Sequence, residues 1–185
     1  MRQPWLIGGA GAALALALVG LVTSEGRARA SGREVALAME GVDPRGLLTG
    51  HYARLALREP APPSGACPPG TESRISAERR GWVALAPAER GWRVRGQART
   101  RTEALRLGPV AVRGFARCFG DGVELDVGVR RFHADQSEAE ALERALRPGG
   151  AGAGQAYALI SVGRDGRARL KGVEVGGRRV ELEWF

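Results

Sequence analysis

The side chains best suited to nucleophilic or metal chemistry are scarce in this chain of 185 residues, which holds two histidines and two cysteines. They are His51, Cys67, Cys118 and His133. None of them stands at a C-x-x-C or H-x-x-x-H spacing, so the sequence predicts no metal site. The serine, histidine and aspartate within residues 133–137 are better explained as a helix cap, because no nucleophile-elbow sequence surrounds the serine. We therefore expect no catalytic residue. No cofactor is expected either, since the chain has no phosphate loop or dinucleotide fingerprint.

The two cysteines have two interpretations. In an oxidising compartment, Cys67 and Cys118 would form a disulfide that ties a proline-rich segment to a later strand. In a reducing compartment they would remain two unrelated thiols. The sequence alone leaves both interpretations open.

Positive charge is unevenly placed along the chain. The formal net charge is +8 at pH 7, and residues 72–131 carry 13 arginines against 7 acidic residues. Lys171 is the only lysine, which indicates a GC-rich genome that supplies arginine by codon usage. The high isoelectric point by itself therefore predicts no nucleic-acid partner.

Four arginines of this region alternate along one face of a strand predicted at residues 92–101. They are Arg93, Arg95, Arg99 and Arg101. Like charges on one face repel each other unless an anion lies opposite them. One interpretation is a patch that binds anionic lipid, an acidic partner protein or a polyanionic glycan. The other is a solvated edge strand whose charges prevent edge-to-edge pairing.

Residues 1–30 are predicted to form a signal-anchor, a transmembrane helix that stays in the mature protein. Residues 5–23 carry no charge, and at ~1.5 Å per residue a helix over them covers most of a ~30 Å hydrocarbon core. The alternative is a cleaved signal peptide, because Ala28-Arg29-Ala30 has the small-x-small form of a cleavage site. The mature chain would then begin at Ser31.

Residues 31–185 are predicted to form one α+β domain of mainly antiparallel strands and hairpins with one short helix. Residues 59–70 hold five of the ten prolines and are predicted to be a loop, because proline interrupts helices and central strands. Asp135 and Glu138 stand at capping-box spacing, which predicts the helix at residues 136–146. Alternating or turn-bounded apolar residues predict strands at 33–40, 51–58, 81–85, 92–101, 110–119, 123–130, 157–162, 168–175 and 178–184.

The segment GHYARLAL at residues 50–57 resembles the motif that names the GDYXXLXY family of bacterial membrane-anchored proteins. Gly50, Tyr52 and Leu55 match the motif, whereas His51 replaces its aspartate and Leu57 its final tyrosine. The resemblance implies one N-terminal span followed by one domain, and it implies no established activity. The imidazole at position 51 removes the fixed negative charge that a Gly-Asp-Tyr segment would offer. Aromatic and aliphatic residues at this spacing also predict a buried structural strand.

Together these features predict a single-pass protein of the bacterial inner membrane with a periplasmic domain, because an apolar segment close to the start is typical of export. The domain is expected to be a non-catalytic binding or scaffolding module. Its expected partners are the membrane itself and either another integral membrane protein or anionic lipid, and no nucleic acid. One alternative is a small envelope hydrolase that uses His51 or His133. Another is a secreted soluble domain released by signal cleavage.

Overall fold

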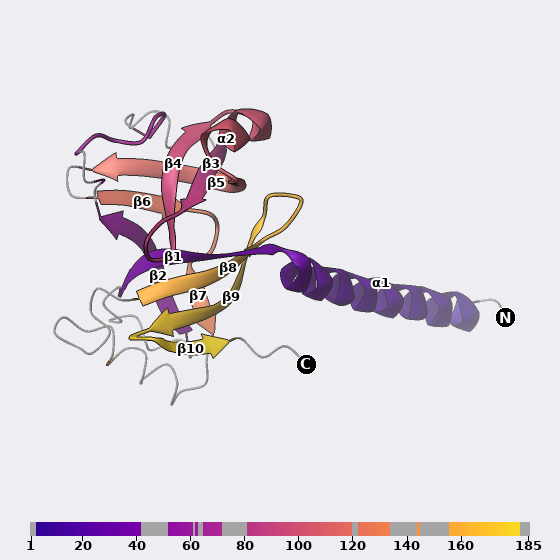
Figure 1. Cartoon of the computed structure of the whole chain (residues 1–185). Coiled ribbons are helices and arrows are strands. Elements are labelled where there is room, and N and C mark those ends of the chain that lie inside the picture. The colour runs from indigo at the N-terminus through magenta and orange to yellow at the C-terminus, as the bar shows by residue number, and fades with distance from the viewer. Residues whose placement is uncertain are drawn as a thin grey trace.

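The computed structural model of the chain describes residues 3–41, 52–60, 62, 65–71, 81–119, 122–133, 144 and 156–181. A long helix, α1 (Gln3–Ser31), projects from a body of strands, and its N-terminal end lies farthest from them (Figure 1). The strands are β1 (Arg33–Gly41), β2 (Tyr52–Pro60), β3 (Gly81–Pro87), β4 (Trp92–Ala98), β5 (Val110–Phe119), β6 (Gly122–Asp126), β7 (Arg131–His133), β8 (Ala156–Val162), β9 (Ala168–Val175) and β10 (Arg178–Glu181). The mainly antiparallel strand content predicted from the sequence is confirmed.

A six-stranded barrel forms within this sheet, whose strand order is β10-β9-β8-β1-β4-β3-β5-β6-β2-β7. Because β2 also pairs with β1, the run β1-β4-β3-β5-β6-β2 closes on itself. Residues 33–38 of β1 pair with β8, and residues 39–41 pair with β2. The β1–β4 seam is parallel, and among the described residues it has the single register pair Leu37–Trp92. The barrel goes beyond the hairpins predicted from the sequence.

The barrel and the face of β8 and β9 share one hydrophobic core. Alternate residues of the strands point inward, and many of these side chains are at most 5% exposed, among them Val35, Leu37, Leu57, Val83, Leu85, Val94, Val112, Val123, Ile160 and Val173. Fully burying a valine or leucine side chain stabilises a fold by roughly 1.5–3 kcal/mol. The alternation seen in the sequence therefore marks the residues that hold the barrel together.

The last three strands extend the sheet from β1 as two hairpins, as predicted. The β9–β10 turn consists of Gly176 and Gly177, whose φ angles of 58° and 81° are both left-handed. Glycine adopts such angles without strain, and a two-residue turn of this hand matches the strand twist. The predicted strand 178–184 ends at Glu181 as described, and residues 182–185 lie outside the described part.

A second helix, α2 (Arg101–Leu107), stands where the sequence predicted the end of the strand 92–101. The Thr100 hydroxyl accepts a hydrogen bond from the Glu103 N–H at 3.3 Å, and the Glu103 carboxylate accepts one from the Thr100 N–H at 3.2 Å. This capping box starts the helix and ends β4 at Ala98. The buried Ala104 packs on the outer face of β3 and β5.

Other predicted boundaries also differ from the structure. β2 continues two residues into the predicted loop 59–70, because its pairing with β6 places Pro60 opposite Gly122. The predicted strand 123–130 ends early: β6 stops at Asp126, Gly128 has a φ of 82°, and β7 begins only at Arg131, beyond the predicted range. The predicted helix at 136–146 lies outside the described residues, apart from residue 144.

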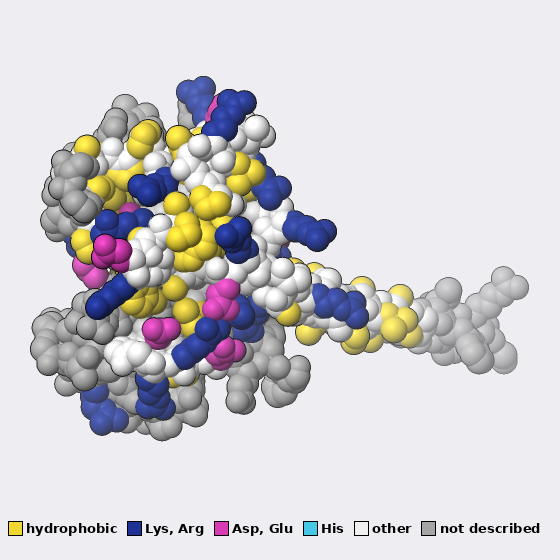
Figure 2. Space-filling view, viewed as in Figure 1, with side chains coloured by type: hydrophobic (Ala, Val, Ile, Leu, Met, Phe, Trp, Pro, Cys, Tyr) yellow, Lys and Arg dark blue, Asp and Glu magenta, His cyan; other side chains and the backbone are white. Residues whose placement is uncertain are grey.

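α1 is the one helix among the described residues that is long and apolar enough to cross a membrane. Leu14, Leu16 and Leu21 are 64%, 73% and 63% exposed, and hydrophobic side chains lie along α1 away from the barrel (Figure 2). So much exposed apolar surface is typical of a segment that contacts lipid. A signal sequence has the same length and composition, so these properties alone fit an anchor and a leader equally well.

Candidate functional site

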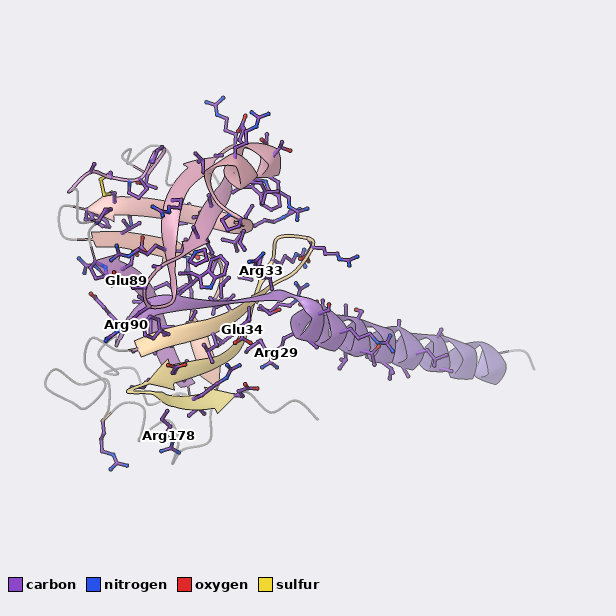
Figure 3. The ribbon with its side chains drawn as sticks, in the orientation of Figure 1. Arg29, Arg33, Glu34, Glu89, Arg90 and Arg178 are labelled. Carbon is purple, nitrogen blue, oxygen red and sulfur yellow. A yellow bond between two sulfur atoms is a disulfide. The ribbon has the colours of Figure 1, made fainter. Side chains whose placement is uncertain are left out.

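The last two turns of α1 are bonded to β9. Glu25 and Arg29 are four residues apart, so they share one face of the helix. Arg169 donates from Nε to Glu25 Oε1 at 2.7 Å and from Nη2 to Oε2 at 3.1 Å. Arg29 Nη2 donates to the carbonyl oxygen of Lys171 at 2.8 Å. The helix thus continues past Thr23, the last residue of the apolar stretch 5–23, into direct contact with the strands (Figure 3).

Arg169 is shared between α1 and the turn that joins β8 to β9. Its guanidinium also donates to Asp165, from Nη1 to Oδ1 at 3.2 Å and from Nη2 to Oδ2 at 3.0 Å. The Arg167 N–H is a further donor to Asp165 Oδ1, at 3.0 Å. These bonds, led by that of Arg169, lower the pKa of Asp165 to about 2. Asp165 therefore remains charged, and the turn remains bonded to α1, at any physiological pH.

Glu34, at the start of β1, forms a second set of ion pairs beside the first. It accepts a hydrogen bond from Lys171 Nζ, and two more from Arg179 at 3.0 and 3.2 Å. The bond from Lys171 and then that from Arg179 lower the pKa of Glu34. Because Lys171 lies in β9 and Arg179 in β10, Glu34 connects three strands. Arg29 and Glu34 lie together at the base of α1 (Figure 3).

Gly32 joins α1 to β1, and its surroundings leave no room for a side chain. A Cβ atom at this position would overlap the hydroxyl oxygen of Ser161 and lie 3.0 Å from the carbonyl oxygen of Val162. The Ser161 side chain is itself fully buried. A glycine therefore allows the chain to pass from helix to strand while it stays in contact with β8.

Replacing Arg169 with glutamine is expected to lower the free energy of unfolding by about 2 kcal/mol, because hydrogen bonds to two carboxylates are lost together. The same change should speed trypsin cleavage after Arg29, since the end of α1 is no longer held by Glu25. Both can be measured on the full chain in detergent, by thermal unfolding and by timed digestion. Arg167→Gln is the matched control, because Arg167 is 69% exposed and pairs with Asp165 only at 3.9 Å. Equal effects of the two substitutions would contradict this role of Arg169.

The β8–β9 turn also packs against Trp82 of β3. The guanidinium carbons of Arg101 and Arg113 lie 5.9 and 5.1 Å from the centroid of the Trp82 ring, within the range of a cation–π interaction. Gly166 has a φ of 75°, and a Cβ atom there would overlap the ring. Arg113 donates from Nε to the Asp165 carbonyl at 2.9 Å and from its backbone N–H to the Gly166 carbonyl at 2.8 Å. One turn therefore contacts Trp82 directly and is linked to α1 through Arg169.

The four arginines predicted to line one strand face do not do so. Arg93 and Arg95 lie on β4, where Arg93 is half-buried and Arg95 is exposed. Arg99 is exposed in the turn after β4, and Arg101 begins α2. β4 ends at Ala98, before the second pair, and the capping box at Thr100 places Arg101 in α2, near Trp82.

The motif at residues 50–57 supplies part of the barrel core. Leu55 and Leu57 are 7% and 3% exposed. Tyr52 begins β2 and stands opposite His133 of β7 in the strand register. Gly50 and His51 lie outside the described residues, as do the side chains of Tyr52 and His133. Within the described part of the chain, no group of three or more His, Cys, Asp or Glu residues could hold a metal ion.

A disulfide joins Cys67 to Cys118, with their Cα atoms 5.7 Å apart. It fixes the second half of the proline-rich loop to β5. The Cys118 N–H donates to the Thr71 carbonyl at 3.1 Å, and the Gln97 N–H of β4 donates to the Pro69 carbonyl at 2.8 Å. Residues 65–71 are therefore bonded to both β4 and β5.

Glu59 of β2 reaches across the poorly paired seam between β1 and β4. Its carboxylate accepts the Val94 N–H, at 3.1 Å to Oε1 and 3.3 Å to Oε2. Burial raises the pKa of Glu59 to about 7, and the hydrogen bond from Val94 and the charges of Arg93 and Arg95 oppose that rise only in part. A cavity of about 10 Å³, about the volume that one water needs, lies beside Glu59 and Trp92.

Comparison with known proteins gives one match. The family model described as GDYXXLXY protein matches residues 14–173. No curated protein and no solved structure matches the chain. The matched region begins within α1 and ends within β9, so it includes both sides of the contact between Glu25 and Arg169.

Proposed function

The chain belongs to the GDYXXLXY protein family, and on that premise we propose that it is a single-span protein of the bacterial inner membrane. Its domain would lie in the periplasm as a non-catalytic binding or scaffolding module. The observation that carries this proposal is the bonding of Glu25 and Arg29 in α1 to β9. In such a protein α1 is both the membrane anchor and a part of the folded domain.

The helix–strand contact favours an anchor over a cleaved leader. Cleavage after Ala30 would remove Glu25 and Arg29, and Arg169 would lose one of its two carboxylate partners. Losing an ion pair from a group that is only 9% exposed is costly, because part of the desolvated charge is left unpaired. A leader peptide has no need of such contacts with the domain that it exports.

The disulfide supports a periplasmic location. Disulfides persist in oxidising compartments such as the bacterial periplasm and are rare in the cytosol. The bond between Cys67 and Cys118 lies within the barrel domain. A helix near the N-terminus that is uncharged over residues 5–23, followed by a domain with a disulfide, suits a chain exported behind its own anchor.

Intact-mass spectrometry of the protein purified from membranes is expected to show a chain that retains residues 1–30. The matched control is Ala30→Leu, which replaces the small residue that a cleavage site needs at its last position. An anchor gives the full-length mass in both proteins. A wild-type chain that begins at Ser31, together with a full-length Ala30→Leu chain, would overturn the proposal. Protease added to intact spheroplasts should digest the domain without lysis, and protection of the domain would contradict the periplasmic location.

A further inference from the structure

We propose that an arginine cluster around Trp82 binds the anionic headgroups of phospholipids in the leaflet from which α1 emerges. We call it the Trp82 cluster: Arg101 and Arg113 lie beside the Trp82 ring, and Arg164 and Arg167 are the exposed arginines of the β8–β9 turn that packs against that ring. The inference rests on the proposed function, because it requires α1 to lie in the membrane. It names a partner for the domain and locates the surface that the partner contacts.

The depth of the cluster is the first argument. Glu25 lies two residues beyond Thr23, about 3 Å further along the helix axis. The headgroup region extends roughly 5–8 Å beyond the hydrocarbon on each side of a bilayer. Glu25 is bonded to Arg169, Arg169 to Asp165, and the Asp165 carbonyl to Arg113. Three direct contacts thus connect a residue at headgroup level to the cluster.

The unbalanced charge of the cluster is the second argument. Among the described residues, no carboxylate lies within salt-bridge distance of Arg101, Arg113 or Arg164. Arg167 reaches Asp165 only at 3.9 Å, and Asp165 is already paired with Arg169. Positive charges without counterions repel each other, and an anionic surface removes that repulsion. A basic residue held near anionic lipid strengthens membrane binding roughly fivefold.

The ring at the centre of the cluster is the third argument. Trp82 is half-buried, and the guanidinium carbons of Arg101 and Arg113 lie 5.9 and 5.1 Å from its ring centroid. Tryptophan is enriched at the membrane interface, where its ring meets lipid carbons and its N–H meets water or headgroups. An acidic protein could also neutralise the arginines. It would not have to approach beside the membrane span, however, and the bonds from Arg113 through Asp165 and Arg169 to Glu25 link the cluster to α1, which favours lipid.

The test compares the full chain in vesicles of phosphatidylcholine with and without phosphatidylglycerol. Displacement of spin-labelled phosphatidylglycerol or phosphatidylcholine gives the relative association constant of the two lipids. Arg164→Gln together with Arg167→Gln is expected to lower the preference for phosphatidylglycerol by up to roughly 25-fold. The corresponding lysine pair should retain the preference, and high salt should weaken it in the wild type.

The matched control is Arg90→Gln with Arg178→Gln, which removes the same charge from two exposed arginines. Both lie away from the base of α1 (Figure 3). The control is expected to keep the preference for phosphatidylglycerol. An unchanged preference in the Arg164 and Arg167 variant, or an equal loss in the control, would overturn the inference. The inference would also be overturned if an acidic protein co-purified with the wild type but not with the Arg164 and Arg167 variant, while the lipid preference of the variant stayed unchanged.

Intact mass, measured on the same vesicle samples, separates this inference from the proposed function. A full-length chain without a preference for phosphatidylglycerol overturns the lipid inference and leaves the membrane anchor standing. A chain that begins at Ser31 overturns both, because the cluster then has no fixed position relative to a bilayer.

Discussion

Replacing Cys67 and Cys118 together with serine is expected to lower the free energy of unfolding by about 4 kcal/mol. The disulfide connects residues 51 positions apart, and restricting a loop of that length in the unfolded chain stabilises the fold by about this amount in the chain-entropy model. Without the disulfide, the loop at residues 65–71 is also expected to be held less firmly in the native state. The Thr71 side chain is 1% exposed, and its carbonyl accepts the Cys118 N–H, so the loop helps to cover β5.

Denaturant unfolding of the full chain in detergent, followed by tryptophan fluorescence, measures this loss. Reductant should shift the wild-type midpoint toward that of the double serine variant and leave the variant itself unchanged. A wild-type midpoint that does not respond to reductant would contradict the expectation. Alkylation without reductant gives an independent check, since two added labels would mean that the thiols are free.

Local features of the fold could be predicted from the sequence because they depend on neighbouring residues. Alternation of apolar side chains predicted β1, and the pattern is confirmed by the burial of Val35, Leu37 and Met39. The Gly176-Gly177 dipeptide predicted a hairpin, since few residues other than glycine tolerate two consecutive left-handed angles.

Closure of the barrel could not be predicted from the sequence in the same way. It depends on pairs between strands that are far apart in the chain, such as Leu37 with Trp92. No local pattern encodes the choice between an open meander and a closed ring. The sheet order is decided by the total burial that closure gives to residues of every strand.

The start of α2 was encoded locally and could have been found. Thr100 and Glu103 form the T-x-x-E signature of a capping box, and Gly108-Pro109 stops the helix. The alternation of arginines with apolar residues also fits a strand, and the strand predicted from it runs three residues beyond the end of β4 at Ala98. The contact of α1 with β9 is different, because Glu25 and Arg169 lie 144 residues apart and show no relation in the sequence.

Glu59 is expected to make the stability of the domain fall as pH rises from about 4.5 to 7. The unfolded chain loses the proton of this carboxyl near its ordinary pKa of 4.5, whereas the folded chain keeps it until about 7. Between these values the folded state binds more protons, so the free energy of unfolding decreases with pH. The loss is at most about 3 kcal/mol and is complete above pH 7.

Glu59→Gln should remove this dependence. The amide stays neutral at every pH, and its carbonyl oxygen can still accept the Val94 N–H. The variant should therefore match the wild type in acid and be more stable than the wild type above pH 7. The quantity to measure is the difference between wild type and variant in the free energy of unfolding at each pH. Glu34 and Asp165, with lowered pKa values, make stability fall in acid in both proteins, and the difference removes their effect. Glu89→Gln, an exposed carboxylate in the β3–β4 turn, is the matched control.

The Val94 amide shows where in the barrel the charge of Glu59 acts. The β1–β4 seam has a single register pair among the described residues, and the Glu59 carboxylate takes the place of a strand carbonyl for Val94. A charged Glu59 draws water into the seam, so local opening there should become easier above pH 7. The hydrogen-exchange protection of the Val94 amide, corrected for its intrinsic rate, should then fall in the wild type and stay constant in Glu59→Gln. A parallel fall in both proteins would mean that another group opens the seam.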